Sequence, residues 1–184
     1  MVIFGSSRQG RRGEVVSNWA RRGIEADGRF EMDFVDSRDL NLPFYDEPFN
    51  PLDRQPEDDY THPEGRAWAQ RVARAEALII ITPEYNHGYP AVLKNALDWV
   101  GPEWGGKPVG FISYGGLAGG ARAVEQLRTV ATELGLAQLR QAIHFPFFKR
   151  AFDENGQPIR ADYYREGLQK MLDELIRLHN LFRD

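Results

Sequence analysis

Glycine, serine and arginine gather in one short stretch near the start of the chain. Residues 5–13 read Gly-Ser-Ser-Arg-Gln-Gly-Arg-Arg-Gly, between a short apolar segment, Val2–Phe4, and the apolar face of an expected helix. Backbone N–H groups, a helix N-terminus and guanidinium groups are together typical of a phosphate site. A solvated basic loop at a strand-to-helix turn is the alternative. Glu14 would repel a phosphate, so the arginines must outweigh it.

A second polar loop follows the most apolar run of the chain. Ile79–Ile81 are β-branched and predict a buried strand, which Pro83 ends because proline lacks an N–H donor. The loop contains Asn86 and Gly88, and helical spacing of apolar residues resumes after Pro90. Loops at the carboxyl end of such a strand are where open α/β sheets bind ligands. A turn residue that bonds its own loop is the alternative role for Asn86.

Acid–base machinery is not evident in these loops. The sequence has no paired-carboxylate motif and no Gly-x-Ser-x-Gly elbow, and its four histidines lack metal-ligand spacing. Ser6 and Ser7 have no obvious base beside them, and a structural or solvated role is favoured for His87. No metal is therefore expected. The loops offer phosphate-binding groups, amides and aromatic rings but no catalytic base. This combination indicates that a bound cofactor supplies the chemistry.

Five strands alternating with five helices must position these loops. The strands are predicted at 2–4, 30–35, 77–82, 109–113 and 136–145, and the last amphipathic stripe runs from Tyr164 to Phe182. Right-handed crossovers make this a parallel three-layer α/β sandwich, a single domain over residues 1–184. The expected strand order, 2-1-3-4-5, has its switch point between the first and third strands, and the glycine-rich loop at 114–120 adjoins it.

Composition narrows the possible partners. The net charge of −4 argues against nucleic acid and anionic membranes, and the chain has no cysteine, which fits a reducing cytoplasm. The longest apolar run, Ala77–Ile81, is too short to cross a bilayer. The irregular stretch 36–62 contains an apolar patch at 42–45 that covers either the site, a partner subunit or its own core.

Three strings of residues carry a specific resemblance. They are Gly5-Ser6-Ser7-Arg8, then Pro83-Glu84-Tyr85-Asn86-His87-Gly88-Tyr89-Pro90 continuing into Leu93-Lys94-Asn95-Ala96-Leu97-Asp98-Trp99, and Ser113-Tyr114-Gly115-Gly116. Together they resemble the NADPH-dependent FMN reductase family, over roughly residues 1–145. The resemblance implies a flavodoxin-like fold, bound FMN and NADPH or NADH as co-substrate.

The resemblance also assigns residues to the cofactor. The FMN phosphate is expected on Ser6, Arg8, Gly13 and one or both of Arg11 and Arg12. The isoalloxazine ring is expected along Pro83, Glu84, Tyr85, Asn86 and Gly88, with Ser113, Tyr114, Gly115 and Gly116 near its pyrimidine edge. No side chain is assigned a catalytic role, because the flavin accepts the hydride. Asn95, Asp98 and Trp99 are expected to support the site or a subunit interface.

The expected activity is transfer of a hydride from NAD(P)H to bound FMN and of electrons onward to a small-molecule acceptor. By resemblance the acceptor is a flavin, quinone, azo compound or chromate. A flavodoxin-type electron carrier without substrate turnover and a non-flavin phospho-ligand binding module are the alternatives. A homodimer or homotetramer is expected, because the apolar patch at 42–45 and the aromatic segment 99–104 suggest exposed apolar surface.

Overall fold

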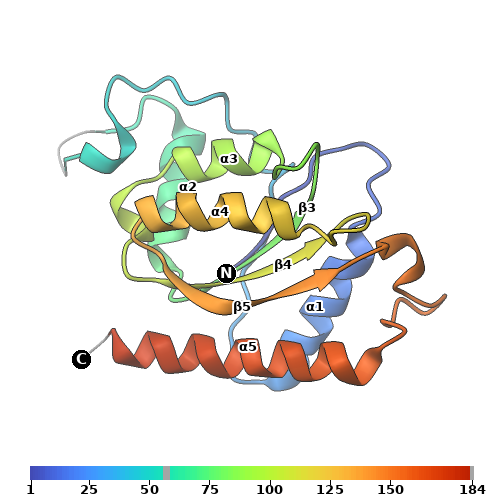
Figure 1. Ribbon diagram of the computed structural model, residues 1–184. Helices are drawn as coiled ribbons and strands as arrows, with labels where there is room; N and C mark the ends of the chain where they lie inside the picture. Colours follow the sequence, from blue (N-terminus) through green and yellow to red (C-terminus); the bar gives the residue numbers. More distant parts are fainter. Residues whose placement is uncertain (56–58, 183–184) are drawn as a thin grey trace.

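A five-stranded parallel sheet lies at the centre of the molecule (Figure 1). The computed structural model describes residues 1–55 and 59–182. The strands have the order β2-β1-β3-β4-β5, so the predicted topology is confirmed. Their bounds are β1 Val2–Phe4, β2 Phe34–Asp36, β3 Leu78–Pro83, β4 Pro108–Tyr114 and β5 Ala137–Phe145.

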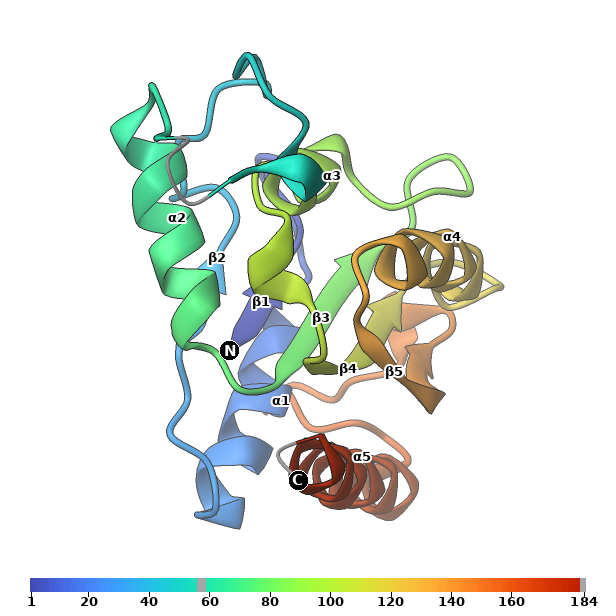
Figure 2. The same cartoon turned by 90° about the vertical axis from the view of Figure 1, so that its left-hand side faces the viewer.

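Helices cover both faces of this sheet, as expected for a three-layer sandwich (Figure 2). Helices α1 and α5 pack on one face, and α2, α3 and α4 pack on the other. Their bounds are α1 Glu14–Asp27, α2 Pro63–Arg74, α3 Ala91–Asp98, α4 Ala121–Glu133 and α5 Ala161–Leu181. Short 3-10 turns lie at η1 Pro51–Asp53, η2 Pro102–Trp104 and η3 Phe148–Arg150. None of the helices described is long and apolar enough to cross a membrane.

The central strand β3 has side chains in both layers. Ile79 and Ile81 pack toward α1 and α5, whereas Leu78 and Ile80 pack toward the other three helices. Because successive side chains of a strand point to opposite faces, a strand buried on both faces must be apolar throughout. Each fully buried aliphatic side chain stabilises the fold by about 1.5–3 kcal/mol, so this run of four residues anchors the sheet between the two layers of helices.

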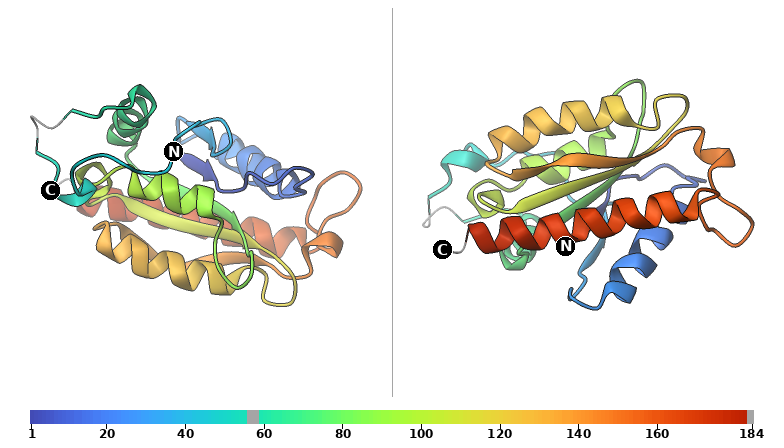
Figure 3. Two further views of the ribbon diagram at one scale, coloured as in Figure 1. Left: turned by 90° about the horizontal axis from the view of Figure 1, so that it is seen from above. Right: turned by 60° about the horizontal axis from the view of Figure 1, so that its bottom comes forward.

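The register places the ligand-binding loops at one edge. Phe4 of β1 is level with Asp36 and Ile81, while Pro83 pairs with Tyr114 and Tyr114 with Phe145. The carboxyl ends of all five parallel strands therefore meet at the same edge, and the loops that leave them lie together there (Figure 3). Three of these loops are the ones that the sequence singled out.

The second strand is shorter than predicted. The alternation at residues 30–35 suggested a strand of that length, but β2 covers Phe34–Asp36 only. The cause is its neighbour: β1 offers only three residues for pairing, so the ladder ends with it. Phe30 and Met32 instead pack against the core beneath α1 and α5 without joining the sheet.

The apolar patch at 42–45 belongs mainly to the core of its own chain. The Asn95 amide accepts a hydrogen bond from Tyr45 N (3.2 Å) and donates one to Pro43 O (2.8 Å), and Trp99 Nε1 also donates to Pro43 O (2.7 Å). Leu42 and Tyr45 pack inward, and only Phe44 is strongly exposed, at 81%. The segment thus follows the packing alternative, and Asn95 and Trp99 hold it in place.

The expectation of exposed apolar surface at residues 99–104 is wrong. Trp99, Val100 and Trp104 are all completely buried within the single chain. Their indole N–H groups explain why burial is tolerated, since Trp104 Nε1 donates to Leu97 O (3.1 Å) and Trp99 Nε1 to Pro43 O. This segment gives no support to a subunit interface.

Candidate functional site

A pocket of about 570 Å³ opens at the carboxyl edge of the sheet. The loop after β1 forms one wall, the ends of β3 and β4 form the floor, and the loop after β5 forms the opposite wall. The lining residues are Arg8, Arg11, Arg12, Pro83, Glu84, Tyr85, Tyr114, Gly115, Gly116, Phe147, Phe148, Lys149 and Arg150. The switch point between β1 and β3, where the strand order reverses, lies within this set.

Free backbone donors line the first loop. Within the described chain, the N–H groups of residues 7–10, 12 and 13 donate to no protein acceptor. Helix α1 begins directly after them, and its N-cap Gly13 makes no side-chain cap. Consecutive unpaired N–H groups and a helix N-terminus both favour an anion. The loop therefore has the donors that a phosphate requires.

Four cations of the pocket lack an acidic partner. Arg8, Arg12, Lys149 and Arg150 form no ion pair with any described carboxylate, and Arg8 makes only a long bond to Gln9 O (3.4 Å). Most other arginines of the chain are matched to an aspartate or glutamate. Unmatched charges that converge on one cavity indicate an anionic ligand.

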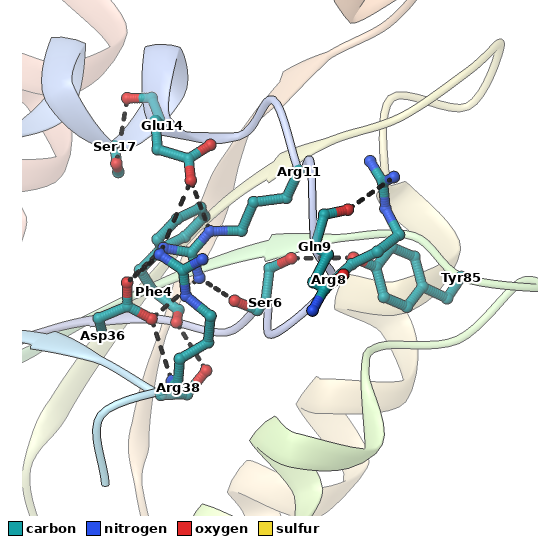
Figure 4. Close-up of polar contacts among 11 residues, drawn as sticks. Phe4, Ser6, Arg8, Gln9, Arg11, Glu14, Ser17, Asp36, Arg38 and Tyr85 are labelled. Carbon is teal, nitrogen blue, oxygen red and sulfur yellow. Dashed lines mark hydrogen bonds and ion pairs between the residues drawn. The ribbon is translucent and has the colours of Figure 1, made fainter.

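Arg11, unlike Arg8 and Arg12, is paired with carboxylates of its own chain (Figure 4). Its side chain is only 3% exposed and forms a two-pronged ion pair with Asp36, together with bonds to Glu14 Oε1 (2.7 Å) and the Ser6 carbonyl. Its guanidinium also lies over the Phe4 ring, 4.2 Å from the centroid. These partners take up its donors, so Arg11 shapes the loop and compensates Glu14.

Burial acts to raise the pKa of Asp36, but hydrogen bonds from Arg11 and Arg38 outweigh it and lower that pKa. The carboxylate therefore stays charged at neutral pH. Arg38 reaches it through both its backbone N–H (3.0 Å) and its guanidinium (3.2 Å). The end of β2 and the start of the first loop are thus joined electrostatically.

Three hydroxyl groups, those of Ser6, Tyr85 and Tyr114, lie at the carboxyl edge of the sheet. Ser6 Oγ and Tyr85 Oη lie 2.8 Å apart, which joins the loop after β1 to the loop after β3. The Tyr114 hydroxyl is buried and has no partner among the described residues, and burial raises its pKa, so it remains protonated. A Cβ on Gly13 would lie 1.9 Å from that oxygen. Glycine is therefore required there by packing against Tyr114.

The loop after β3 contains a tight turn. Tyr85 N donates to Gly88 O (2.8 Å) and Gly88 N to Tyr85 O (2.9 Å). Asn86 and His87 between them have left-handed φ values of 50° and 70°. Asparagine adopts this conformation more readily than most residues, which supports a turn role for Asn86. A direct bond from its amide to the flavin stays a prediction, since its side chain lies outside the pocket lining.

Two further residues predicted from the sequence, Glu84 and Ser113, lie near the carboxyl ends of β3 and β4. Glu84 Oε1 accepts a bond from Arg122 (2.6 Å), while its Oε2 is buried without a partner in the described structure. Ser113 is buried on the opposite face of β4, where its Oγ donates to Gly119 O (2.9 Å) and lies 2.7 Å from His144 Nδ1. A neutral His144 with its proton on Nδ1 satisfies both bonds, and burial lowers its pKa.

The structure thus brings nine of the residues assigned from sequence into one pocket: Arg8, Arg11, Arg12, Pro83, Glu84, Tyr85, Tyr114, Gly115 and Gly116. The other five lie outside its lining: Ser6, Gly13, Asn86, Gly88 and Ser113. Sequence reasoning missed the fourth loop, which contributes Phe147, Phe148, Lys149 and Arg150. Two basic residues soon after a fifth parallel strand were the available signal.

Comparison with known proteins agrees with this geometry. The family model for NADPH-dependent FMN reductase matches residues 1–149. An NAD(P)H-dependent FMN reductase of Schizosaccharomyces pombe is 39% identical over 146 residues, covering 79% of this chain and 70% of the relative. A 2-hydroxy-1,4-benzoquinone reductase from Burkholderia is 36% identical, covering 79% of this chain and 77% of that protein.

A solved structure shares the fold. The flavoenzyme NAD(P)H:(acceptor) oxidoreductase FerB from Paracoccus denitrificans superposes with a TM-score of 0.73 at 23% identity, covering 98% of this chain and 96% of that one. The flavodoxin-like architecture expected from sequence is confirmed. With a family model matched over most of its length, the chain belongs to the NADPH-dependent FMN reductase family.

Proposed function

We propose that this protein oxidises NAD(P)H at an FMN held in the pocket between the four loops and passes the electrons to a small quinone. As a member of its family, the chain is an NAD(P)H-dependent oxidoreductase that uses FMN. The observation that carries the proposal lies at the switch point: the first loop has N–H groups that donate to no acceptor among the described residues, and beside them Arg8 and Arg12 form no ion pair with a described carboxylate.

The residues present fit FMN. The first loop offers amide donors and two unmatched guanidinium groups to a terminal phosphate, and Ser6 Oγ can turn from Tyr85 to the same group. A Cβ on Gly116 would meet nothing within 4 Å, so the backbone there is open to close approach by a flat ring. The buried Tyr114 hydroxyl and Glu84 Oε2 offer a donor and an acceptor that still need partners.

When bound, FMN supplies the redox chemistry by accepting a hydride from the nicotinamide and giving electrons to the acceptor. The protein's own residues bind and orient. Arg122 holds Glu84 at the pocket floor, and the Tyr85–Gly88 backbone bonds keep the loop after β3 in one shape. Fixed donors of this kind lose little entropy when the ligand binds. Reduction of a quinone to a hydroquinone also takes up one proton, which water can supply, so no side chain is assigned to proton transfer.

A quinone is the acceptor class we favour. The Burkholderia relative is named for reduction of a hydroxybenzoquinone, and its match covers 79% of the present chain. The pocket combines cations with the apolar surfaces of Pro83, Tyr85 and Phe147, and this combination suits a flat ring with polar oxygens.

Steady-state oxidation of NADPH by the purified FMN-loaded protein tests the proposal. A hydroxylated benzoquinone should support faster turnover than free FMN or an azo dye. A visible spectrum before and after addition of NADPH, without acceptor, should show bleaching of the flavin band. A protein whose flavin bleaches but which supports turnover with no small acceptor would instead be an electron carrier. A colourless protein that cannot be reconstituted with FMN would contradict the cofactor assignment.

We also propose a homo-oligomer working in the cytoplasm. Phe44 and Leu117 are 81% and 77% exposed, on two separate loops, and such side chains are often covered by a second subunit. Light scattering at the working concentration tests this, and a fully active monomer would argue against it. The absence of cysteine fits the reducing conditions of a cytoplasm.

A further inference from the structure

The loop after β5 is fixed to the glycine loop after β4. Gly115 N donates to Phe145 O (3.2 Å), Phe147 N to Gly116 O (2.7 Å) and Phe148 N to Gly115 O (3.1 Å). Gly119 lies against the same loop, since a Cβ there would be 2.8 Å from Pro146 N. We call residues 146–150 the β5 loop. These backbone hydrogen bonds hold the β5 loop in place as one wall of the pocket.

Phe147 adopts a conformation that its own packing does not require. Its φ and ψ are 47° and 43°, a left-handed geometry that is costly for a residue with a Cβ. Phe147 is nevertheless 57% exposed and lines the pocket. Strained residues held by surrounding hydrogen bonds cluster at ligand-binding sites. The exposed ring at the rim offers a flat apolar surface to a ligand.

The cations of the pocket fall into two separate pairs. Arg8 and Arg12 leave the carboxyl end of β1, whereas Lys149 and Arg150 follow β5. Strands β3 and β4 lie between β1 and β5, so the two pairs belong to separate loops of the pocket. FMN has a single phosphate, and the first loop offers that phosphate a helix N-terminus and backbone N–H groups without a described acceptor, besides Arg8 and Arg12. The second pair is then left without an anion.

We propose that the β5 loop binds the phosphate-bearing nucleotide portion of the nicotinamide co-substrate. Lys149 and Arg150 pair with its phosphates, and Phe147 packs against one of its rings. This inference rests on the proposed function, in which the FMN phosphate lies on the first loop. A dinucleotide fits the chemistry because it combines two or three phosphates with two flat rings. Its anionic groups are either the pyrophosphate, common to NADH and NADPH, or the 2′-phosphate of NADPH alone.

The test measures equilibrium binding of NADP⁺ and NAD⁺ to the FMN-loaded protein by titration calorimetry. The double variant Lys149→Ala/Arg150→Ala should weaken NADP⁺ binding about tenfold, because two partly exposed charge pairs are lost. The matched control is Arg140→Ala/Lys170→Ala, which also removes one arginine and one lysine, from the groove between β5 and α5. The control should bind both nucleotides as the wild type does.

The two nucleotides distinguish the two anion sources. Weaker binding of NADP⁺ alone would assign the pair to the 2′-phosphate, and an equal loss for NAD⁺ would assign it to the pyrophosphate; either supports the proposal. Unchanged affinity for both would overturn it. A loss of FMN affinity instead would also overturn it, because the cations would then serve the cofactor. Calorimetry needs no turnover, so an inactive wild type that still binds NADP⁺ would refute only the proposed acceptor reaction.

A second variant separates binding from folding. Phe147→Gly removes the ring and relieves the left-handed strain at the same time. We expect a melting temperature within about 2 °C of the wild type, because the relief offsets the greater entropy of unfolded glycine. NADP⁺ affinity should fall about three- to tenfold. A large fall in melting temperature with unchanged NADP⁺ affinity would show that the ring serves the fold alone and would overturn its assigned role.

Discussion

Replacing Arg11 by alanine should destabilise the fold, unlike replacement of the other two arginines in the same loop. Arg11 is buried between Asp36, Glu14 and Phe4. Its removal leaves Asp36, whose side chain is 13% exposed, with Arg38 as its remaining cationic partner. Arg12 is exposed and has no carboxylate partner among the described residues, so Arg12→Ala is the matched control.

The size of the effect follows from these contacts. Breaking a fully buried ion pair from one side costs about 3–5 kcal/mol. Arg38 still serves Asp36, which reduces the cost, while the lost contact over Phe4 adds about 0.5–1 kcal/mol. The half-exposed Glu14 pair contributes little after solvent screening. The expected loss is about 3 kcal/mol, or roughly 6–12 °C in melting temperature for a chain of this size.

The loss should depend on pH in a definite direction. Because the pKa of Asp36 is lowered in the folded protein, its stabilisation is present above the unfolded pKa of about 4. It disappears as the pH falls through the folded pKa. The difference in free energy of unfolding between wild type and Arg11→Ala should therefore be full at pH 7 and shrink as the pH is lowered toward 3.

Urea unfolding of FMN-free protein at several pH values measures this, because bound cofactor would add its own stabilisation. Equal urea midpoints for wild type and Arg11→Ala at pH 7 would refute the reasoning. So would an equal loss in Arg12→Ala, because an exposed guanidinium without a carboxylate partner has no comparable role in the folded state.

Other changes should separate binding from packing. Arg8→Ala and Arg12→Ala should each weaken FMN binding about 10- to 100-fold, measured by quenching of flavin fluorescence, with an unchanged urea midpoint. Asn86→Ala should lower the free energy of unfolding by about 1 kcal/mol because residue 86 has a left-handed φ, whereas Asn86→Gly should be as stable as the wild type. If both variants slow flavin reduction in stopped flow, the Asn86 amide acts on the flavin ring. Gly65→Ala should cost several degrees in a thermal melt, since its Cβ would lie 2.2 Å from Trp99.

The sequence predicted most of the fold because its signals are local. The β-branched run at 79–81 and the helical stripes are readable by period alone, and right-handed crossovers then leave few topologies. Pairing depends on the neighbour, and this is why β2 came out shorter than its alternation suggested. The same holds for burial: nothing local distinguishes a Trp99 that contacts its own loop at 42–45 from one that faces a second subunit.

The candidate site shows the same division. Composition located the basic loop, but it could not tell which arginines bind phosphate. That depends on Asp36, at the end of a different strand, which forms an ion pair with Arg11. An aspartate at the carboxyl end of β2 lies level with Phe4, next to the loop, and captures the arginine that reaches it. In a parallel sheet, charges at the ends of adjacent strands therefore have to be considered together before any of them is assigned to a ligand. The reasoning extends to Lys149 and Arg150, which lie in the loop after a different strand and form no ion pair with a carboxylate in the described chain.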